Sequence, residues 1–553
     1  MRPSFKAALI AAVAVVGTVA ATGLTVPAGA APVHHPRSTP TPQEIWAATL
    51  PAPAPLSWGA CADPDLADAG AQCAMFTVPL DWNKPKGATI QLAVSRVLHT
   101  SPDSQYQGVM LTNPGGPGGS GLGLSTLGSA VPNGAGDYYD WIGFDPRGVG
   151  SSVPRLSCIP DYSAGPRPSY IPTTRALARV WLQRSKSYAQ ACASGDGAAL
   201  LRHMRTEDVA KDMDYLRVAL GQKQINYYGF SYGTYLGQVY TTYFPSHMRR
   251  MVLDSTVDPR GFWYKDNLDQ DVAFDRNVNI WFGWVAKYDS VYHLGATQAA
   301  VRATWYREKA ALAKNPAGGV VGADEWTDIF LYSGYYQEYW TYLGSVFADW
   351  INNKNTAELV SAYQSFDSPT DDNGNAVYLG VQCTDAPSPH SWQTWQRDNW
   401  RTYAVAPFET WGNAWFNAPC LYWPAQAKQA VTINGSRTAS VLMIDQTLDA
   451  ATPYPGSLYV RSIYPNASLI AEPGGTTHAD TLFGNACVDD QIAVYLATGQ
   501  RPARQPGYQA DTTCAPTPQP VPTAASAAAA KSSGSSRLTL AQKAIVQAAV
   551  TRG

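Results

Sequence analysis

The sequence has no excess of positive charge. Its 40 lysines and arginines are balanced by 42 aspartates and glutamates, and charged residues make up only 15% of the chain. A protein that binds nucleic acid through the phosphate backbone needs a surplus of basic residues. The sequence therefore argues against nucleic-acid binding, and its hydrophobic content of 45% is that of an ordinary globular protein.

Long apolar runs are also scarce. The one long run covers residues 7–26, follows two basic residues and is followed by the small residues 28–30. This order is typical of an export signal peptide. A membrane anchor is the alternative, but no second apolar span follows. We expect residues 1–30 to be a signal peptide, 31–45 a flexible or pro-segment stretch, and the mature protein to be secreted without stable membrane association.

The spacings of a metal site are absent as well. None of the eight cysteines forms the close doublets of a zinc site, and no histidine belongs to an HExxH-type helix. We therefore predict neither metal nor cofactor. Cysteines of an exported protein form disulfides, and these eight fall into successive close pairs, although sequence alone does not fix their connectivity. The expected pairs are Cys61–Cys73, Cys158–Cys192, Cys383–Cys420 and Cys487–Cys514.

Short apolar runs alternate with helical spacing along most of the chain. The helical spacing is clearest in residues 207–220, where Val209, Met213 and Leu216 share one face. Strands that alternate with helices imply an α/β core, with a mostly parallel sheet flanked by helices. The strand-like runs cover residues 74–79, 89–97, 108–112, 141–144, 225–228, 251–253, 441–444 and 468–471.

The alternation of strand-like and helical segments stops between residues 254 and 440. This stretch holds 13 of the 18 tryptophans and is mostly helical in pattern. Such an insertion between strands indicates a cap over the carboxyl edge of the sheet. The alternative is that the tryptophans fill the core of this segment itself, and we expect this of most of them. The predicted organisation is a core of residues 46–257 and 439–514, a helical cap of 258–438, and a Pro/Ala/Ser-rich linker and tail of 515–553.

A nucleophile motif lies at Gly229-Phe230-Ser231-Tyr232-Gly233. A nucleophile at a sharp strand-to-helix turn has a strained backbone, and its neighbours must be small to avoid clashes. The five-residue pattern alone is a weak signal, because a glycine-rich chain produces it by accident. Here a predicted strand precedes it and a predicted helix follows it. We therefore predict Ser231 as the nucleophile.

A glycine-rich loop, residues 113–121, directly follows a predicted strand. Acyl transfer generates an oxyanion that must be bound by preorganised N–H donors. One donor is the residue after the nucleophile, here Tyr232, and the other comes from this loop. Gly116 is the predicted loop donor, with Gly115 as the near alternative. A phosphate-binding loop is disfavoured, because no Walker lysine follows.

The general base and its acid are found by chain order. The order nucleophile, acid, histidine requires a histidine late in the chain, and His478 is the one histidine after residue 390. The acid must follow the strand at 441–444, in the turn that contains Asp449; Asp445 is the less favoured alternative. We predict that His478 accepts the proton of Ser231 and that Asp449 fixes the imidazole.

With these residues assembled, the chain from Trp58 to Cys514 resembles the secreted bacterial tripeptidyl aminopeptidases, relatives of prolyl aminopeptidase. The resemblance implies an α/β-hydrolase fold and the release of tripeptides from free N-termini of peptides and proteins, with Ser231, Asp449 and His478 as the triad. Its motifs are NPGGPGGSG (113–121), GFDPRGVG (143–150), YYGFSYGTYLG (227–237), NLDQDVAF (267–274), CTDA (383–386), TWGNAW (410–415) and LDAATPY (448–454).

Selectivity for a free N-terminus requires a fixed anion, because a buried ammonium without a partner is costly. Asp385 and Glu409 are the predicted candidates, and a solvated or capping carboxylate is the alternative interpretation of Asp385. The resemblance implies a glutamate before Cys383, where this chain has Gln382.

Two other functions stay open. Fold and triad do not select peptides over esters, so a secreted esterase or lipase-like hydrolase is one alternative. A catalytically inactive secreted binding protein on the same fold is the other, although the complete triad argues against it. In each case we expect a monomer.

Overall fold

The computed structural model describes residues 39–367, 369–522 and 538–549, and the account below concerns the compact unit that begins at Pro40. The predicted signal peptide lies outside the described residues. The sequence predicts flexibility up to residue 45, whereas helix α1 (Pro42–Ala47) begins earlier. Thr41 and Glu44 stabilise its first turn as a capping box.

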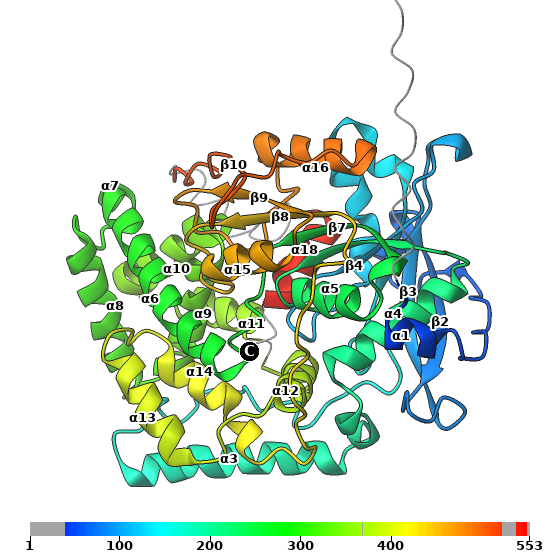
Figure 1. The fold of residues 1–553 in the computed structure, drawn as a ribbon. Coiled ribbons are helices and arrows are strands. Elements are labelled where there is room, and N and C mark those ends of the chain that lie inside the picture. The colour runs from blue at the N-terminus through cyan, green and yellow to red at the C-terminus, as the bar shows by residue number, and fades with distance from the viewer. Residues whose placement is uncertain (1–38, 368, 523–537, 550–553) are drawn as a thin grey trace, which may run out of the picture. The chain divides into compact units, whose positions relative to one another are not determined.

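A ten-stranded sheet forms the centre of the fold (Figure 1), with the order β1-β2-β3-β5-β4-β6-β7-β8-β9-β10. The pairs β1–β2, β2–β3 and β3–β5 are antiparallel and the other six are parallel, which confirms the predicted mostly parallel sheet. The strands are β1 (Gly59–Ala60), β2 (Gln72–Pro79), β3 (Thr89–Val97), β4 (Val109–Asn113), β5 (Asp140–Phe144), β6 (Ile225–Phe230), β7 (Met248–Asp254), β8 (Val441–Gln446), β9 (Ala467–Glu472) and β10 (Thr512–Thr513).

Helices cover both faces of the sheet. In β6, Tyr227 packs on one face and Tyr228 on the other, and both are fully buried. Because neither face of the central strands meets water, these strands are largely apolar rather than alternating. The first face is covered by α4 (Thr206–Ala219), α5 (Tyr232–Tyr243) and α15 (Pro455–Ile463), and the second by η2 (Leu122–Ala130), η3 (Pro132–Tyr138), α16 (Ala486–Thr498) and α18 (Leu540–Ala549).

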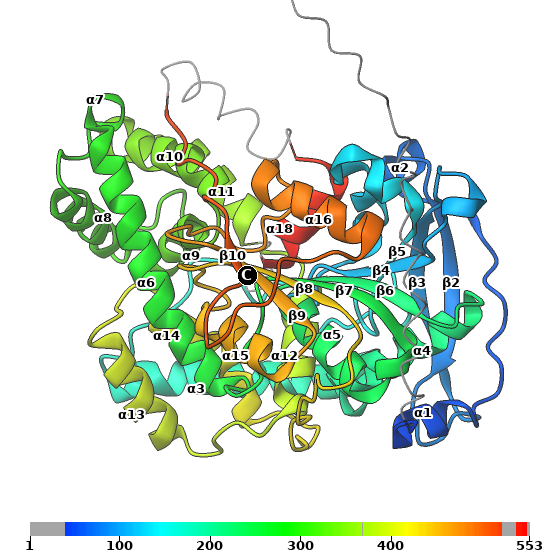
Figure 2. The same ribbon diagram turned by 45° about the horizontal axis from the view of Figure 1, so that its top comes forward.

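The helices between β7 and β8 are here called the cap helices (Figures 1 and 2). Those from α6 to α11 form a layer of their own, whereas α12 packs in the same buried cluster as the strands of the sheet. Trp281, Trp305, Trp326 and Trp340 are buried in a core of their own within this layer. The cap helices are α6 (Tyr264–Lys287), α7 (Asp289–Tyr292), α8 (Gln298–Leu312), α9 (Ala323–Tyr335), η6 (Gln337–Tyr339), α10 (Trp340–Asn353), α11 (Thr356–Phe366), α12 (Asn373–Asp385), α13 (Trp392–Tyr403), α14 (Thr410–Asn417) and η7 (Ala418–Leu421).

An earlier segment also packs on the cap helices. Helix α3 (Arg175–Ser194) precedes β6, and its Trp181 stacks on Trp415 of α14 with ring centroids 5.7 Å apart. The helical layer therefore includes residues outside the predicted range 258–438. Four short elements complete the description: α2 (Pro64–Asp68), η1 (Asp103–Gln105), η4 (Ala198–Arg202) and η5 (Pro245–His247).

Helix α18 follows the predicted linker and packs on the core. Ala541, Ala544 and Ile545 are buried in the same cluster as residues of η2 and α16. In Figure 2 the helix lies beneath α16, next to the central strands. The segment expected as a linker and tail therefore contains a helix with an apolar contact face.

The eight cysteines form four disulfides, and the predicted pairing is confirmed. The bonds are Cys61–Cys73, Cys158–Cys192, Cys383–Cys420 and Cys487–Cys514. Across the described residues, no helix is both long and apolar enough to cross a membrane.

Candidate active site

Ser231 lies at the turn between β6 and α5, with φ 53° and ψ −128°. Non-glycine residues rarely adopt a positive φ, and strain of this kind is typical of a nucleophile turn. A Cβ atom on Gly229 would lie 2.6 Å from the carbonyl oxygen of Gly233, and one on Gly233 would lie 2.6 Å from that of Asn113. Both neighbouring glycines are therefore required by close packing. The turn is fixed further by Ser231 N–H, which donates to the Asp254 carbonyl at 3.0 Å.

His478 and Asp449 form a buried pair. The His478 Nδ1 to Asp449 Oδ2 distance is 2.7 Å, and the exposed fractions of the side chains are 1% and 0%. The other oxygen of Asp449 accepts from the N–H groups of Ala451 at 2.8 Å and Thr452 at 3.0 Å. Burial opposes ionisation of Asp449, but the contact with His478 and the hydrogen bond from the Thr452 N–H outweigh it and lower the pKa of Asp449. The carboxylate is therefore held ionised.

The alternative acid, Asp445, has a different partner. Its Oδ2 accepts from Ser457 Oγ at 2.5 Å, and burial together with the Asp449 carboxylate raises its pKa well above the ordinary value. Nε2 of His478, by contrast, has no hydrogen-bond partner within the described part of the chain. The structure thus pairs His478 with Asp449 and leaves the second imidazole nitrogen available for a proton transfer.

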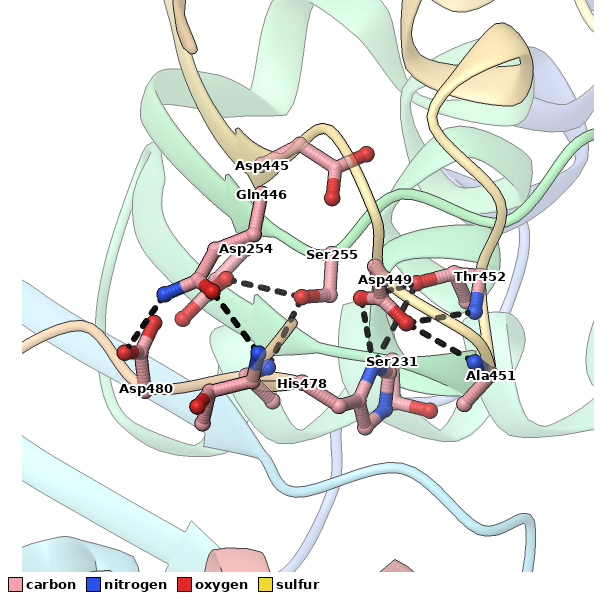
Figure 3. A network of polar contacts seen from close by, with 12 residues as sticks. Ser231, Asp254, Ser255, Asp445, Gln446, Asp449, Ala451, Thr452, His478 and Asp480 are labelled. Atoms are coloured by element: carbon pink, nitrogen blue, oxygen red, sulfur yellow. Dashed lines mark hydrogen bonds and ion pairs between the residues drawn. The ribbon is translucent and has the colours of Figure 1, made fainter. Parts of the chain in front are cut away.

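Residues behind the pair fix the loop that carries His478 (Figure 3). Ser255 Oγ donates to Asp254 Oδ1 at 3.1 Å and accepts from the N–H of Ala479 at 2.8 Å. On the other side, the Gln446 side chain accepts from the N–H of Thr477 at 2.7 Å and donates to Asp480 at 2.8 Å. Asp254, Ser255 and Gln446 end or follow β7 and β8, so the ends of two strands hold the imidazole in place.

The glycine-rich loop lies directly against the nucleophile turn. Gly115 has φ 98°, and a Cβ atom there would lie 2.8 Å from Ser231 Cβ and 2.7 Å from the Phe230 carbonyl. Its own N–H already donates to Asn113 Oδ1 at 3.0 Å. Because the N–H of Gly115 is committed, the geometry favours Gly116 as the loop donor. Gly116, Ser231 and Tyr232 line one cavity.

This cavity has a volume of about 250 Å³. That is slightly below the range of about 300–1,000 Å³ typical of small-molecule sites, so a short peptide segment fits better than a folded chain. Trp263 is the one buried tryptophan of the cap region among its lining residues, and Gln382 also lines it. Its acidic residues are Asp258, Asp266 and Asp269, which the sequence pattern did not single out.

The two residues predicted for amino-terminus binding are not among those that line this cavity. Asp385 is buried, and its two oxygens accept from the N–H of Thr206 at 2.8 Å and from its hydroxyl at 2.6 Å, at the start of α4. Burial raises the pKa of Asp385 to about 7. Glu409 precedes α14, is 5% exposed and lines a second, smaller cavity beside Arg167 and Asn413. Gln382 accepts from Asn267 Nδ2 at 3.3 Å.

Two contributors to the site had little sequence signal. Thr452 donates its hydroxyl to Asp449 Oδ2 at 2.9 Å, and a threonine three residues after an acid is too common a pattern to single out. Asp254 holds the Ser231 turn through its backbone carbonyl, and its side chain accepts from the hydroxyl groups of Ser255 and Thr481. No sequence motif indicates such contacts. Among the described residues, no three His, Cys, Asp or Glu side chains are grouped to hold a metal ion.

Comparison with known proteins identifies the family of this chain. Residues 108–370 match the family described as alpha/beta hydrolase fold, and residues 406–514 match the family described as TAP-like protein. The chain is 42% identical to "Tripeptidyl aminopeptidase" of Streptomyces lividans, over 85% of this chain and 88% of that protein. It is 31% identical to "Carboxylesterase B" of Mycobacterium tuberculosis, over 81% and 88%. It is 28% identical to "Serine protease Hip1" of the same species, over 81% and 90%.

The 42% identity extends over most of both proteins. The two matched families cover strands β4 to β7 and β8 to β10, respectively, together with most of the cap helices. The chain therefore belongs to the tripeptidyl aminopeptidase family of the α/β-hydrolase fold.

Proposed function

We propose that this protein is a secreted serine peptidase that releases tripeptides from free N-termini of peptides and proteins. The observation that carries the proposal is the buried 2.7 Å contact of His478 Nδ1 with Asp449 Oδ2, on the same sheet edge as the strained Ser231 turn. Family membership at 42% identity supports the same reaction, because the relative is named for it.

The proposed chemistry needs no cofactor. Ser231 Oγ attacks the scissile carbonyl carbon while His478 Nε2 takes its proton, and the Asp449 carboxylate stabilises the resulting imidazolium. The N–H groups of Gly116 and Tyr232 bind the oxyanion. When the C–N bond breaks, Nε2 returns the proton to the leaving amine. Water then hydrolyses the acyl-enzyme ester by the same proton route, and the tripeptide is released.

The acids of the cavity are the proposed partners of the substrate ammonium. Asp258 is paired with Arg260 and Asp269 with Lys265, whereas Asp266 Oδ2 is buried and has no partner within the described residues. Burial and the neighbouring Asp258 and Asp269 raise the pKa of Asp266 well above its ordinary value. A bound ammonium would relieve this cost, so Asp266 is the first candidate. Asp385 and Glu409 remain candidates from the sequence.

Export is part of the proposal. Four disulfides and no free cysteine fit an oxidising compartment, because such bonds are rare in reducing cytosol. The apolar run at residues 7–26 supplies the export signal in this proposal. Size-exclusion chromatography with light scattering tests the expected monomer.

The test is product mapping by mass spectrometry with a set of free and N-acetylated peptides. The proposal expects tripeptides from the free peptides and little or no product from the acetylated ones. Labelling by a fluorophosphonate, mapped to Ser231, tests the nucleophile independently. Internal cleavage of acetylated peptides at equal rates would contradict the exopeptidase assignment. Absence of labelling at Ser231 would favour the inactive binding protein.

An esterase is the second candidate, because one relative at 31% identity is named "Carboxylesterase B". The alcohol of an ester is a better leaving group than an amine and depends less on a proton from His478, so the same triad serves both reactions. Short-chain nitrophenyl esters assayed beside free tripeptide anilides separate the two. Dominant ester turnover with no cleavage of any free peptide would select the esterase.

A further inference from the structure

Helix α18 contacts the glycine-rich loop through its smallest side chains. A Cβ atom on Gly119 of the loop would lie 2.4 Å from Ala548 Cβ, and one on Gly123, in η2 just after the loop, would lie 3.2 Å from Ala544 Cβ. Ala544 and Ala548 are one helical turn apart and both are buried. Glycine on the loop and alanine on the helix are therefore both needed for this close approach.

The same helix contacts the loop that carries His478. Gln542 Nε2 donates to the Leu482 carbonyl at 3.0 Å. Leu482 and Ala479 both have a positive φ, 66° and 53°, which side-chain-bearing residues rarely adopt. A strained loop keeps its conformation only where surrounding contacts hold it. Gln542 supplies one of these contacts, at Leu482, which lies four residues after His478.

The glycine-rich loop lies between α18 and the cap helices. Opposite Ala548, a Cβ atom on Gly118 would lie 2.7 Å from the Gly374 carbonyl of α12. Within the loop, Gly119 N–H donates to the Gly115 carbonyl at 3.3 Å, and Gly115 in turn lies against Ser231. A displacement of Gly119 would therefore be transmitted to the proposed oxyanion donor Gly116 over a very short distance.

We propose that α18 is a positioning element of the active site, which holds the oxyanion loop and the His478 loop in their catalytic arrangement. This inference rests on the proposed function, since it assigns those loops their roles. A positioning role differs from a role in stability alone, because it predicts that disturbing α18 slows the chemical step while substrate affinity stays unchanged. Misplacement of catalytic groups by about 1 Å costs on the order of 100-fold in rate.

The test compares two adjacent substitutions of the full chain. Ala548→Leu places three extra carbons against Gly119, whereas Gln547→Leu changes the exposed neighbouring position by a similar side chain. Ala548→Leu is expected to lower kcat, and the rate of fluorophosphonate labelling of Ser231, by at least about tenfold with KM within twofold. Gln547→Leu is expected to retain wild-type rates.

A third variant keeps the test decisive if Ala548→Leu does not fold. Gln542→Leu removes two hydrogen bonds, one to the Leu482 carbonyl and one from the N–H of Thr539, and retains the side-chain volume. Folding should therefore persist, and kcat is expected to fall severalfold. Unchanged kcat and labelling in both variants, with melting temperatures near wild type, would overturn the inference. A rise in activity would overturn it too, because α18 would then obstruct the site.

The two proposals fail in different ways. A wild-type protein that labels at Ser231 but cleaves only esters would overturn the proposed peptidase function, yet ester turnover would still report the effect of Ala548→Leu. A wild-type protein that cleaves free peptides normally, with variants indistinguishable from it, would overturn only the role of α18.

Discussion

Ser231 has a backbone conformation that costs free energy, of the order of 1–3 kcal/mol for a residue of this kind. The strand before it, the helix after it and the hydrogen bond to the Asp254 carbonyl impose this conformation. None of these contacts uses the serine hydroxyl. The backbone of the turn is therefore independent of the group that performs the proposed chemistry.

Replacing that hydroxyl is expected to remove activity and leave the fold intact. Ser231→Ala should lower kcat by about 10⁴-fold or more, because triad members act as a unit. Steady-state kinetics give the activity, and circular dichroism with thermal melting gives the fold. A fully active Ser231→Ala protein would mean that another serine is the nucleophile.

Asp385 predicts a pH dependence of stability. Its folded pKa of about 7 is raised above the ordinary value by burial, so the folded state binds its proton more tightly than the unfolded state. The contribution of Asp385 to stability is therefore full below its unfolded pKa and falls as pH rises to about 7. Asp385→Asn, which mimics the protonated form, should reduce the fall in melting temperature as the pH rises from 5 to 8. Identical pH profiles for both proteins would contradict this assignment.

Asp385→Asn also serves as a comparison for the ammonium site. Among Asp266→Asn, Asp385→Asn and Glu409→Gln, we expect Asp266→Asn to reduce the preference for free over des-amino tripeptide anilides most. A lost charged hydrogen bond corresponds to about 10- to 100-fold in kcat/KM for the free substrate. Turnover of the des-amino substrate is the internal control. An unchanged preference in Asp266→Asn would transfer the role to one of the other two carboxylates.

At the scale of elements, the Cys383–Cys420 bond joins the end of α12 to η7 and encloses α13 and α14. Closing this 37-residue separation restricts the unfolded chain, and removal of such a bond typically costs about 2–5 kcal/mol. Cys383→Ser, Cys420→Ser and the double variant should therefore melt at similarly lowered temperatures. Additive losses in the double variant, or no loss at all, would be incompatible with a bond between these two residues.

At the scale of the molecule, all four disulfides link residues 12 to 37 apart in sequence, and none joins the first half of the sheet to the second. Reductant should therefore lower the melting temperature while leaving a single folded state at ambient temperature, because the buried sheet core is independent of the bonds. Thermal melting with and without reductant measures this. Complete unfolding by reductant alone at 25 °C would show that the bonds are required for the fold.

Local patterns predicted much of this molecule. Ser231, Asp449 and His478 each follow a strand whose composition marks it, and close cysteine spacing indicated the disulfides. Packing between distant segments was not predictable in the same way. Asp266 on α6 and Gln382 on α12 meet at one cavity only because the cap helices fold together. Helix α18 is short, and nothing in its own ten residues says that its alanines fit Gly119 and Gly123.

The cap helices leave the sheet from β7 and return to β8, and these two strands are neighbours paired in parallel, with Asp254 opposite Ile444. An insertion whose two ends are anchored on adjoining strands can be lengthened, shortened or exchanged without altering the strand order around it. Ser231, His478 and Asp449 all lie outside this insertion, whereas Asp266 and Gln382 lie inside it. Changes in the insertion can thus alter which substrates bind while the proposed catalytic residues stay the same.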